Sequence, residues 1–157
     1  MTSEKRRPRP ATQYGPTAAT VAANVRRIRE RRGLTIYALS GALEKAGRPI
    51  AASAVAKIER MERQVTVDDL MALSVVLGVS PATLLLPADS RIDTEITGGG
   101  QVHARDAWMW AWCREPLRMP EHFDEEVYDR LVAEFMLISR PLGMYSGPGG
   151  ADGPSVD

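Results

Sequence analysis

The segment AASAVAKIERMERQ, residues 51–64, combines small side chains with a cluster of cations. On a helix, Lys57, Arg60 and Arg63 can share much of one face. Small side chains let a backbone approach a partner closely, and ammonium and guanidinium groups bind anions such as phosphates. The segment therefore indicates a helix that lies close against an anionic surface.

Helical periodicity in the surrounding chain predicts the elements that hold this segment. Within it, Val55 and Ile58 lie at helical spacing and would face a core. Apolar stripes before and after it predict four more short helices, so residues 17–87 form a mainly α-helical domain of five helices. The signals for helix starts are Thr35, Thr66 and Ser80, and those for helix ends are Gly33, Gly47 and Gly78.

The order of these helices is that of a helix-turn-helix. One helix ends near Gly33, a second begins after Thr35, and a third begins with small residues. The third helix of such a unit lies in a DNA major groove about 12 Å wide, with its N-terminal residues against the base edges. Bulky side chains there would hold the backbone away from the bases, and the cations that follow would meet phosphates. The sequence thus predicts double-stranded DNA as a partner.

The sequence resembles the Cro/CI-type (XRE) helix-turn-helix family. The resemblance rests on VRRIRERRGLTIYALSGAL and on SAVAKIERMERQVTVDDLMALSVVLGVSPATLLL, which together follow the family pattern through all five helices. It implies a lambda-repressor-like fold and a sequence-specific transcriptional regulator that acts as a repressor. Members commonly bind two half-sites as dimers, so we expect a homodimer. The chain is also similar to repressors of actinobacterial phages and integrative elements.

The resemblance implies which residues touch DNA. Contacts to bases fall on Ala52, Ser53 and Lys57. Contacts to phosphates fall on the N-terminus of the second helix and on the turn after the third, at Thr35, Arg60 and Arg63.

Other positions concern the architecture of the domain. Arg29 and Glu59 match a family ion pair that ties the first helix to the third, so we assign them to structure and not to base reading. Two positions depart from the pattern. Ile36 stands where the family often has a polar contact, and Met61 stands where glycine usually turns the chain. We therefore expect one missing DNA anchor and a third helix that continues for another turn.

Two further basic stretches could approach DNA. The connection EKAGRPI is longer than the family minimum, and we expect it to extend the second helix and to place Lys45 and Arg48 near the DNA or near nothing. Residues 1–16 form a flexible arm that follows the DNA backbone, enters a minor groove, or is a solvated tail. Its cations are Lys5, Arg6, Arg7 and Arg9.

The charge of the chain divides near Pro87. The formal net charge is zero, yet residues 1–87 hold 14 Lys and Arg against 7 Asp and Glu, and residues 88–157 hold 6 against 13. A basic half that binds a polyanion joined to an acidic half with another task fits this asymmetry, as does mutual attraction of the halves. We expect an acidic domain over residues 88–141, used for assembly, a protein partner or an effector, and a disordered tail over residues 142–157.

The acidic half is predicted to hold a short hairpin and two helices. RIDTEIT and QVHA alternate apolar and polar residues around GGG, which indicates paired strands. Asp106 would cap a helix AWMWAWCRE, and DEEVYDRLVAEFMLISR is strongly amphipathic. The apolar face of that last helix is either a core or a dimer interface; it is formed by Val127, Leu131, Phe135 and Ile138.

The remaining chemistry-bearing residues favour no enzyme. Trp108, Trp110 and Trp112 indicate an aromatic core more than a ligand pocket. Cys113 lies too far from His103 and His122 in sequence to suggest a zinc site. We find no nucleophile–base–acid set, so we expect neither a cofactor nor a metal.

Two other functions stay open beside gene regulation: an antitoxin-like or adaptor module that uses the same fold to bind protein, and a small-molecule sensor that uses the tryptophans. The chain holds one cysteine and no apolar run near the roughly 18 residues of a membrane span. Its first residues have cations but no apolar stretch after them, unlike a secretory signal. We therefore expect a cytoplasmic protein.

Overall fold

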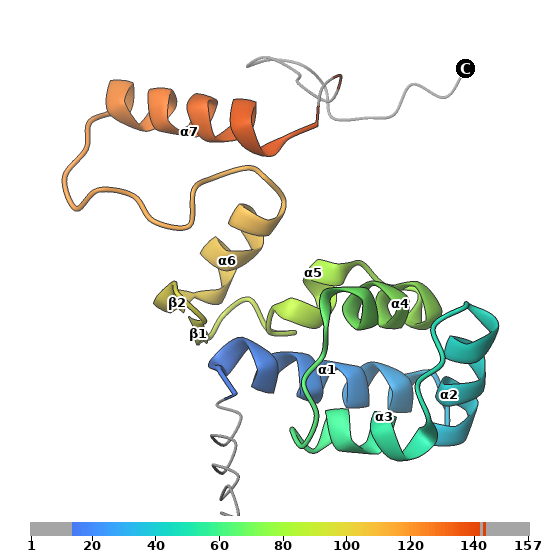
Figure 1. Cartoon of the computed structure of the whole chain (residues 1–157). Helices are drawn as coiled ribbons and strands as arrows, with labels where there is room; N and C mark the ends of the chain where they lie inside the picture. The colour runs from blue at the N-terminus through green and yellow to red at the C-terminus, as the bar shows by residue number, and fades with distance from the viewer. Residues whose placement is uncertain (1–13, 142, 144–157) are drawn as a thin grey trace, which may run out of the picture. The chain divides into compact units, whose positions relative to one another are not determined.

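A computed structural model describes residues 14–141 and 143 (Figure 1). The predicted disordered tail, apart from Gly143, and the cations of the predicted arm lie outside the described residues. The chain divides into two compact units between Leu85 and Leu86, two residues before the predicted boundary. Trp108 Nε1 donates a hydrogen bond to the Pro87 carbonyl over 3.0 Å, which joins this stretch to the second unit. Each unit is described by itself below.

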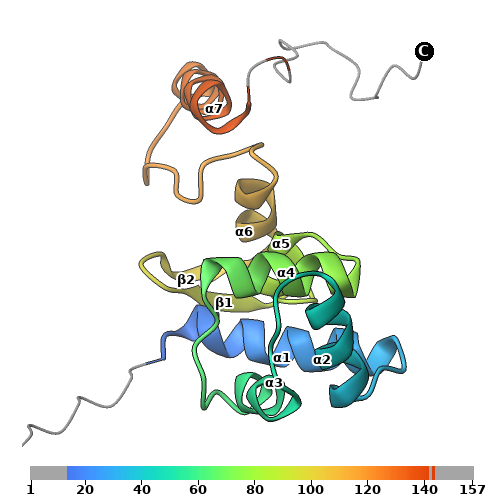
Figure 2. The same cartoon turned by 45° about the vertical axis from the view of Figure 1, so that its right-hand side comes forward.

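The first unit holds the five predicted helices. They are α1 (Pro16–Arg31), α2 (Ile36–Lys45), α3 (Ala52–Glu59), α4 (Val67–Leu77) and α5 (Pro81–Leu85). Figures 1 and 2 show α1 between α3 on one side and α4 on the other, and α1 contacts both as well as α5. α1 includes Pro16 at its first position and so begins inside the segment that was predicted as a flexible arm.

One apolar core holds these helices together. Its fully or almost fully buried members come from every helix of the unit and include Val25, Leu39, Leu43, Val55, Ile58, Leu73, Leu77 and Leu84. The helical spacing that predicted Val55 and Ile58 as core positions is confirmed, since both are at most 1% exposed. Burial of such side chains stabilises the fold by about 1.5–3 kcal/mol each.

The predicted helix starts are confirmed by their capping hydrogen bonds. The Thr35 side chain accepts from the backbone N–H of Ala38 over 3.0 Å at the start of α2. At the start of α4, Thr66 and Asp69 form a capping box, in which each side chain accepts from the other's backbone N–H. These bonds satisfy N–H groups that the first turn of a helix leaves without partners.

The predicted extension of α3 past Met61 is wrong. α3 ends at Glu59, because Met61 takes a left-handed conformation with φ of +60°. The Glu62 N–H then donates to the Lys57 carbonyl over 2.7 Å and the Met61 N–H to the Ile58 carbonyl over 3.0 Å. This is the Schellman ending that helices usually form with glycine at the left-handed position. The chain therefore turns where the family turns, with a methionine in place of the glycine.

The predicted extension of α2 into the EKAGRPI connection, residues 44–50, holds only for Glu44 and Lys45. α2 ends at Lys45, and Gly47 takes φ of +80°. The Arg48 N–H donates to the Leu43 carbonyl, which closes another Schellman ending. The connection then enters the core through Ile50, which is 3% exposed. Because Ile50 is buried in the core, the longer connection is an ordered part of the domain.

The second unit begins with the predicted hairpin. Strands β1 (Asp93–Ile96) and β2 (Gly100–His103) pair antiparallel, with Asp93 opposite His103 and Ile96 opposite Gly100. Helix α6 (Ala104–Ala111) follows β2 directly. Its N-cap is His103, whose side chain accepts from the Arg105 N–H over 3.3 Å. The prediction that Asp106 caps this helix is wrong, because the strand runs straight into the helix and leaves Asp106 in the first turn.

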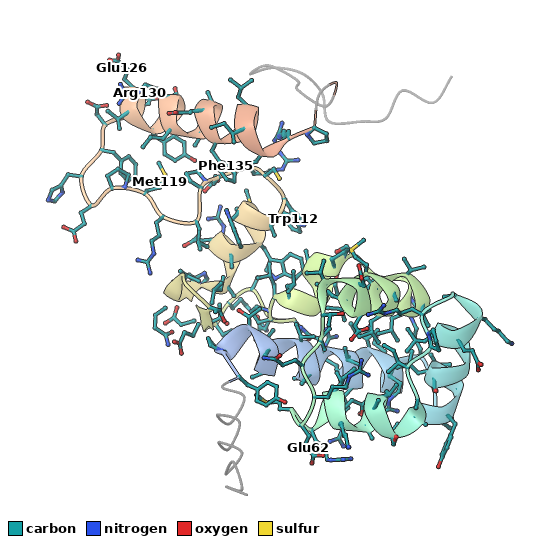
Figure 3. All side chains as sticks on the ribbon, viewed as in Figure 1. Glu62, Trp112, Met119, Glu126, Arg130 and Phe135 are labelled. Atoms are coloured by element: carbon teal, nitrogen blue, oxygen red, sulfur yellow. The ribbon has the colours of Figure 1, made fainter. Side chains whose placement is uncertain are left out.

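Helix α7 (Glu125–Ser139) is the second predicted helix of this unit, and none of its residues is buried. Val127, Leu131 and Phe135 are partly covered, whereas Ile138 is 76% exposed. A groove of about 510 Å³ lies between this face and the segment around Met119, and Figure 3 labels Met119 and Phe135. The face thus packs in part on its own unit.

The tryptophans of α6 and of its C-cap, Trp112, lie as a helix requires. Trp108 and Trp112 share a face with ring centroids 5.5 Å apart, and Trp110 points elsewhere. Trp112 is 57% exposed and Trp110 39% exposed. The expected aromatic core is therefore only half formed: Trp108 is partly buried, and the fully buried residues of α6 are Ala104 and Ala107.

Candidate nucleic-acid interface

The exposed face of α3 carries small side chains and one long cation. Ser53 and Lys57 are exposed, and Ala52 and Ala56 are partly so. The opposite face of the helix, which includes Val55, is buried in the core. The backbone of α3 can therefore approach a surface closely, with the Lys57 ammonium as its longest polar group.

Thr35 lies at the exposed N-terminus of α2. The N-terminal end of a helix carries partial positive charge and favours an anion, such as a phosphate oxygen. The neighbouring Ile36 is partly buried and packs against the core, so this position holds no polar anchor. Thr35 and Tyr37, which is 80% exposed, are thus the polar side chains that the described structure offers where α2 begins.

Arg29 and Glu59 form a buried bidentate ion pair. Arg29 Nε lies 2.6 Å from Glu59 Oε1 and Nη2 lies 2.9 Å from Oε2, and both side chains are at most 10% exposed. Arg29 Nη1 also donates to the Leu34 carbonyl over 2.8 Å. The hydrogen bond to Glu59 raises the pKa of the Arg29 guanidinium above its ordinary value. The pair ties α1 to the last residue of α3 and lies away from solvent.

A second buried carboxylate holds both connections that flank α3. Asp69 on α4 is fully buried and accepts from Arg48 Nε over 2.9 Å and from Arg63 Nη2 over 3.0 Å. Arg48 precedes α3 and Arg63 follows it. The prediction that Arg48 lies near DNA or near nothing did not include this role, and Asp69 was not among the predicted residues. The arrangement fixes both ends of α3 to one point of the core.

Arg60, which follows α3 directly, has an exposed partner. Arg60 Nε donates to Glu62 Oε1 over 2.8 Å and Nη2 donates to Oε2 over 2.9 Å, with both side chains more than half exposed. These hydrogen bonds raise the pKa of Arg60 and lower the pKa of Glu62. Figure 3 shows Glu62 on the turn after α3, pointing away from the helices.

Lys57 differs from the arginines around it. Within residues 14–141 no carboxylate lies within 4.0 Å of its ammonium group. The arginines of the turn after α3, by contrast, have their carboxylate partners within the same domain. The Lys57 ammonium is therefore available to donate hydrogen bonds to an acceptor on a bound molecule.

This geometry agrees with a comparison of the sequence against protein families. Residues 25–84 match the helix-turn-helix family model. They form a helix-turn-helix domain of the Cro/CI (XRE) type. No curated protein and no solved structure matches the chain. The helix-turn-helix match covers α2 and α3 entirely, and such a domain implies DNA binding.

The second unit lies outside the helix-turn-helix match. In the part of the chain that the structure describes, no group of three or more His, Cys, Asp or Glu side chains is placed to hold a metal ion. None of the described helices combines the length and apolar character that a membrane crossing needs. The Cys113 thiol donates to the Ser139 carbonyl over 3.5 Å, and Arg140 Nε donates to the Cys113 carbonyl over 3.0 Å. These bonds tie the end of α7 to the turn after α6.

Proposed function

We propose that this protein is a sequence-specific DNA-binding transcriptional regulator that acts as a repressor. The observation that carries the proposal is the exposed face of α3. There Ser53 and Lys57 lie among alanines, and ion pairs anchor the connections before and after the helix. Such a face fits the major groove because nothing bulky separates the helix backbone from the base edges. The helix-turn-helix match of residues 25–84 supports the same function.

In this proposal the contacts divide between bases and phosphates. Ala52 offers a methyl contact to thymine and Ser53 a hydroxyl that can serve several bases. Lys57 donates to the O6 and N7 acceptors of guanine and supplies most of the polar discrimination. The phosphates are bound by three groups that border α3 and the start of α2: Thr35, Arg60 and Arg63.

Arg63 can bind a phosphate while it keeps its place in the core. A guanidinium has five N–H donors, and Arg63 uses Nη2 for Asp69. Its side chain is 35% exposed, so its remaining donors are accessible to an oxygen on DNA. Arg63 would then connect the DNA backbone directly to the buried Asp69, and through it to α4.

We also propose that the protein binds DNA as a homodimer in the cytoplasm. A dimer presents two copies of α3 to half-sites that lie about 34–36 Å apart. The second unit, with its acidic surface, serves assembly or receives a signal from a protein partner or effector. The narrower similarity to repressors of phages and integrative elements belongs to this proposal as well.

Selection of bound duplexes from a random-sequence pool with the purified full chain tests the proposed function. We expect enrichment of an inverted repeat whose half-sites each contain a guanine read by Lys57. Recovery of a folded protein with no enriched sequence would contradict sequence-specific regulation. It would favour the adaptor or antitoxin-like alternative, in which the same fold binds protein.

A further inference from the structure

Glu62 is an exposed acid beside the proposed DNA-binding surface. Its two carboxylate oxygens accept from Nε and Nη2 of Arg60 over 2.8 and 2.9 Å. Both side chains are more than half exposed, at 56% for Arg60 and 51% for Glu62. Glu62 thus occupies two donors on one edge of the Arg60 guanidinium, in the turn that directly follows α3 (Figure 3).

The edge of a guanidinium binds a carboxylate and a phosphate in the same way, through two parallel N–H···O bonds. The two anions therefore compete for Arg60. We propose that Glu62 competes internally with a DNA phosphate for Arg60 and so lowers the affinity of the domain for DNA. This inference rests on the proposed function. It adds Glu62, which lowers the affinity for DNA, to the set of residues that bind DNA.

The other acids near α3 do not fit this role. Glu59 and Asp69 are buried, and each holds two segments of the domain together through an arginine. Glu62 has Arg60 as its hydrogen-bonded partner, and the two residues are separated by Met61 alone. Because an exposed pair of this kind contributes little to folding, substitution of Glu62 leaves the domain folded.

The test is Glu62→Gln in the full chain, which removes the charge and keeps the size of the side chain. We expect binding to a random-sequence DNA duplex, measured by fluorescence anisotropy, to become about two- to fivefold tighter. A random duplex suffices because phosphate contacts do not depend on base sequence. The matched control is Glu44→Gln on α2, which is exposed and removes the same charge from the same domain, and we expect a smaller gain from it.

A double-mutant cycle with Arg60→Gln shows whether Glu62 acts through Arg60. We expect Arg60→Gln to weaken binding more in the Glu62→Gln background than in the wild type, because Glu62 no longer competes for the guanidinium. A gain from Glu62→Gln that persists without Arg60, or that equals the gain from Glu44→Gln, would overturn the inference. A wild-type protein that binds no duplex at any salt concentration would instead overturn the proposed function.

Discussion

Among the cations near α3, Lys57 is set apart by the absence of a carboxylate within 4.0 Å in the described structure. Its neighbours in the turn after α3 each share their charge with an acid of the same domain. An ammonium that is exposed and unpaired can give its full hydrogen-bonding capacity to an acceptor on DNA. This difference in charge pairing makes Lys57 the side chain on which base discrimination should depend.

We expect Lys57→Ala to cost about 1–3 kcal/mol of binding free energy on the selected DNA site and to relax the preference at one guanine. Titration of the selected site, of the site with that guanine replaced, and of random DNA measures both effects. Lys45→Ala is the charge-matched control, since Lys45 is an exposed lysine of α2. An equal loss on selected and random DNA would identify Lys57 as a phosphate contact and contradict its placement against the bases.

The Arg29–Glu59 pair leads to a prediction about stability. Arg29→Ala would leave the Glu59 carboxylate, 7% exposed, without its bidentate partner. We expect the free energy of unfolding to fall by about 3–5 kcal/mol, measured by urea denaturation. The control is Arg26→Ala, whose pair with Glu30 is exposed and should contribute less than about 0.5 kcal/mol. Equal effects of the two substitutions would show that burial does not decide the strength of the pair.

At the scale of the elements, residues in the left-handed conformation set where the helices around α3 end. α2, α3 and α4 each end at a residue with positive φ, at Gly47, Met61 and Gly78. The first of these endings lies before α3, and the second ends α3 at Glu59. These turns set the direction of the chain after Gly47 and after Met61. The chain then places Arg48 and Arg63 beside Asp69.

Two glycines allow a matched test of this point. Gly78 has φ of +60°, and a Cβ built on it would lie 2.9 Å from Arg32 Nη2. We expect Gly78→Ala to lower the free energy of unfolding by about 1–2 kcal/mol, because side chains disfavour this conformation. Gly41 lies inside α2 with nothing within 4 Å of its Cβ position, so Gly41→Ala should raise stability by about 0.5–1 kcal/mol. Thermal and urea unfolding of both variants measure the change in the free energy of unfolding, which should be negative for Gly78→Ala and positive for Gly41→Ala. Changes of the same sign in the two variants would contradict the argument from backbone conformation.

At the scale of the whole molecule, the two units differ in how much they bury. The first unit has a core drawn from all five of its helices, whereas the buried apolar residues of the second unit, among those described, are Leu86, Ala104 and Ala107. We therefore expect the first unit to fold by itself. The acidic half should repel DNA from a distance, and salt should screen that repulsion.

We predict that residues 1–87 alone fold and bind duplex DNA at least as tightly as the full chain. If about 5–7 phosphates are neutralised, the logarithm of the binding constant should fall with the logarithm of salt concentration with a slope of roughly −4 to −6. Titrations of fragment and full chain at several salt concentrations measure the slope and the difference. A slope near zero for a folded fragment would exclude DNA as its partner.

The sequence by itself determined the elements of the first unit and the face of α3. Helix starts at Thr35 and Thr66 and the end at Gly78 are local events, made by side chains and backbone within one turn, so local signals predicted them. The buried positions of α3 followed from periodicity alone. The hairpin of the second unit was predictable for the same reason, since its strands are neighbours in the chain.

Only the tertiary structure decided which partner each cation takes. Arg48 and Asp69 are 21 residues apart, and nothing local brings them together. The left-handed Met61 was missed because a bulky side chain disfavours that conformation, and it is accepted here where the domain turns the chain after α3. Ion pairs between distant segments depend on the packing of the whole core, which a local pattern does not contain. Arg60, by contrast, takes a partner two residues away, and among the described residues no carboxylate lies within 4.0 Å of the Lys57 ammonium.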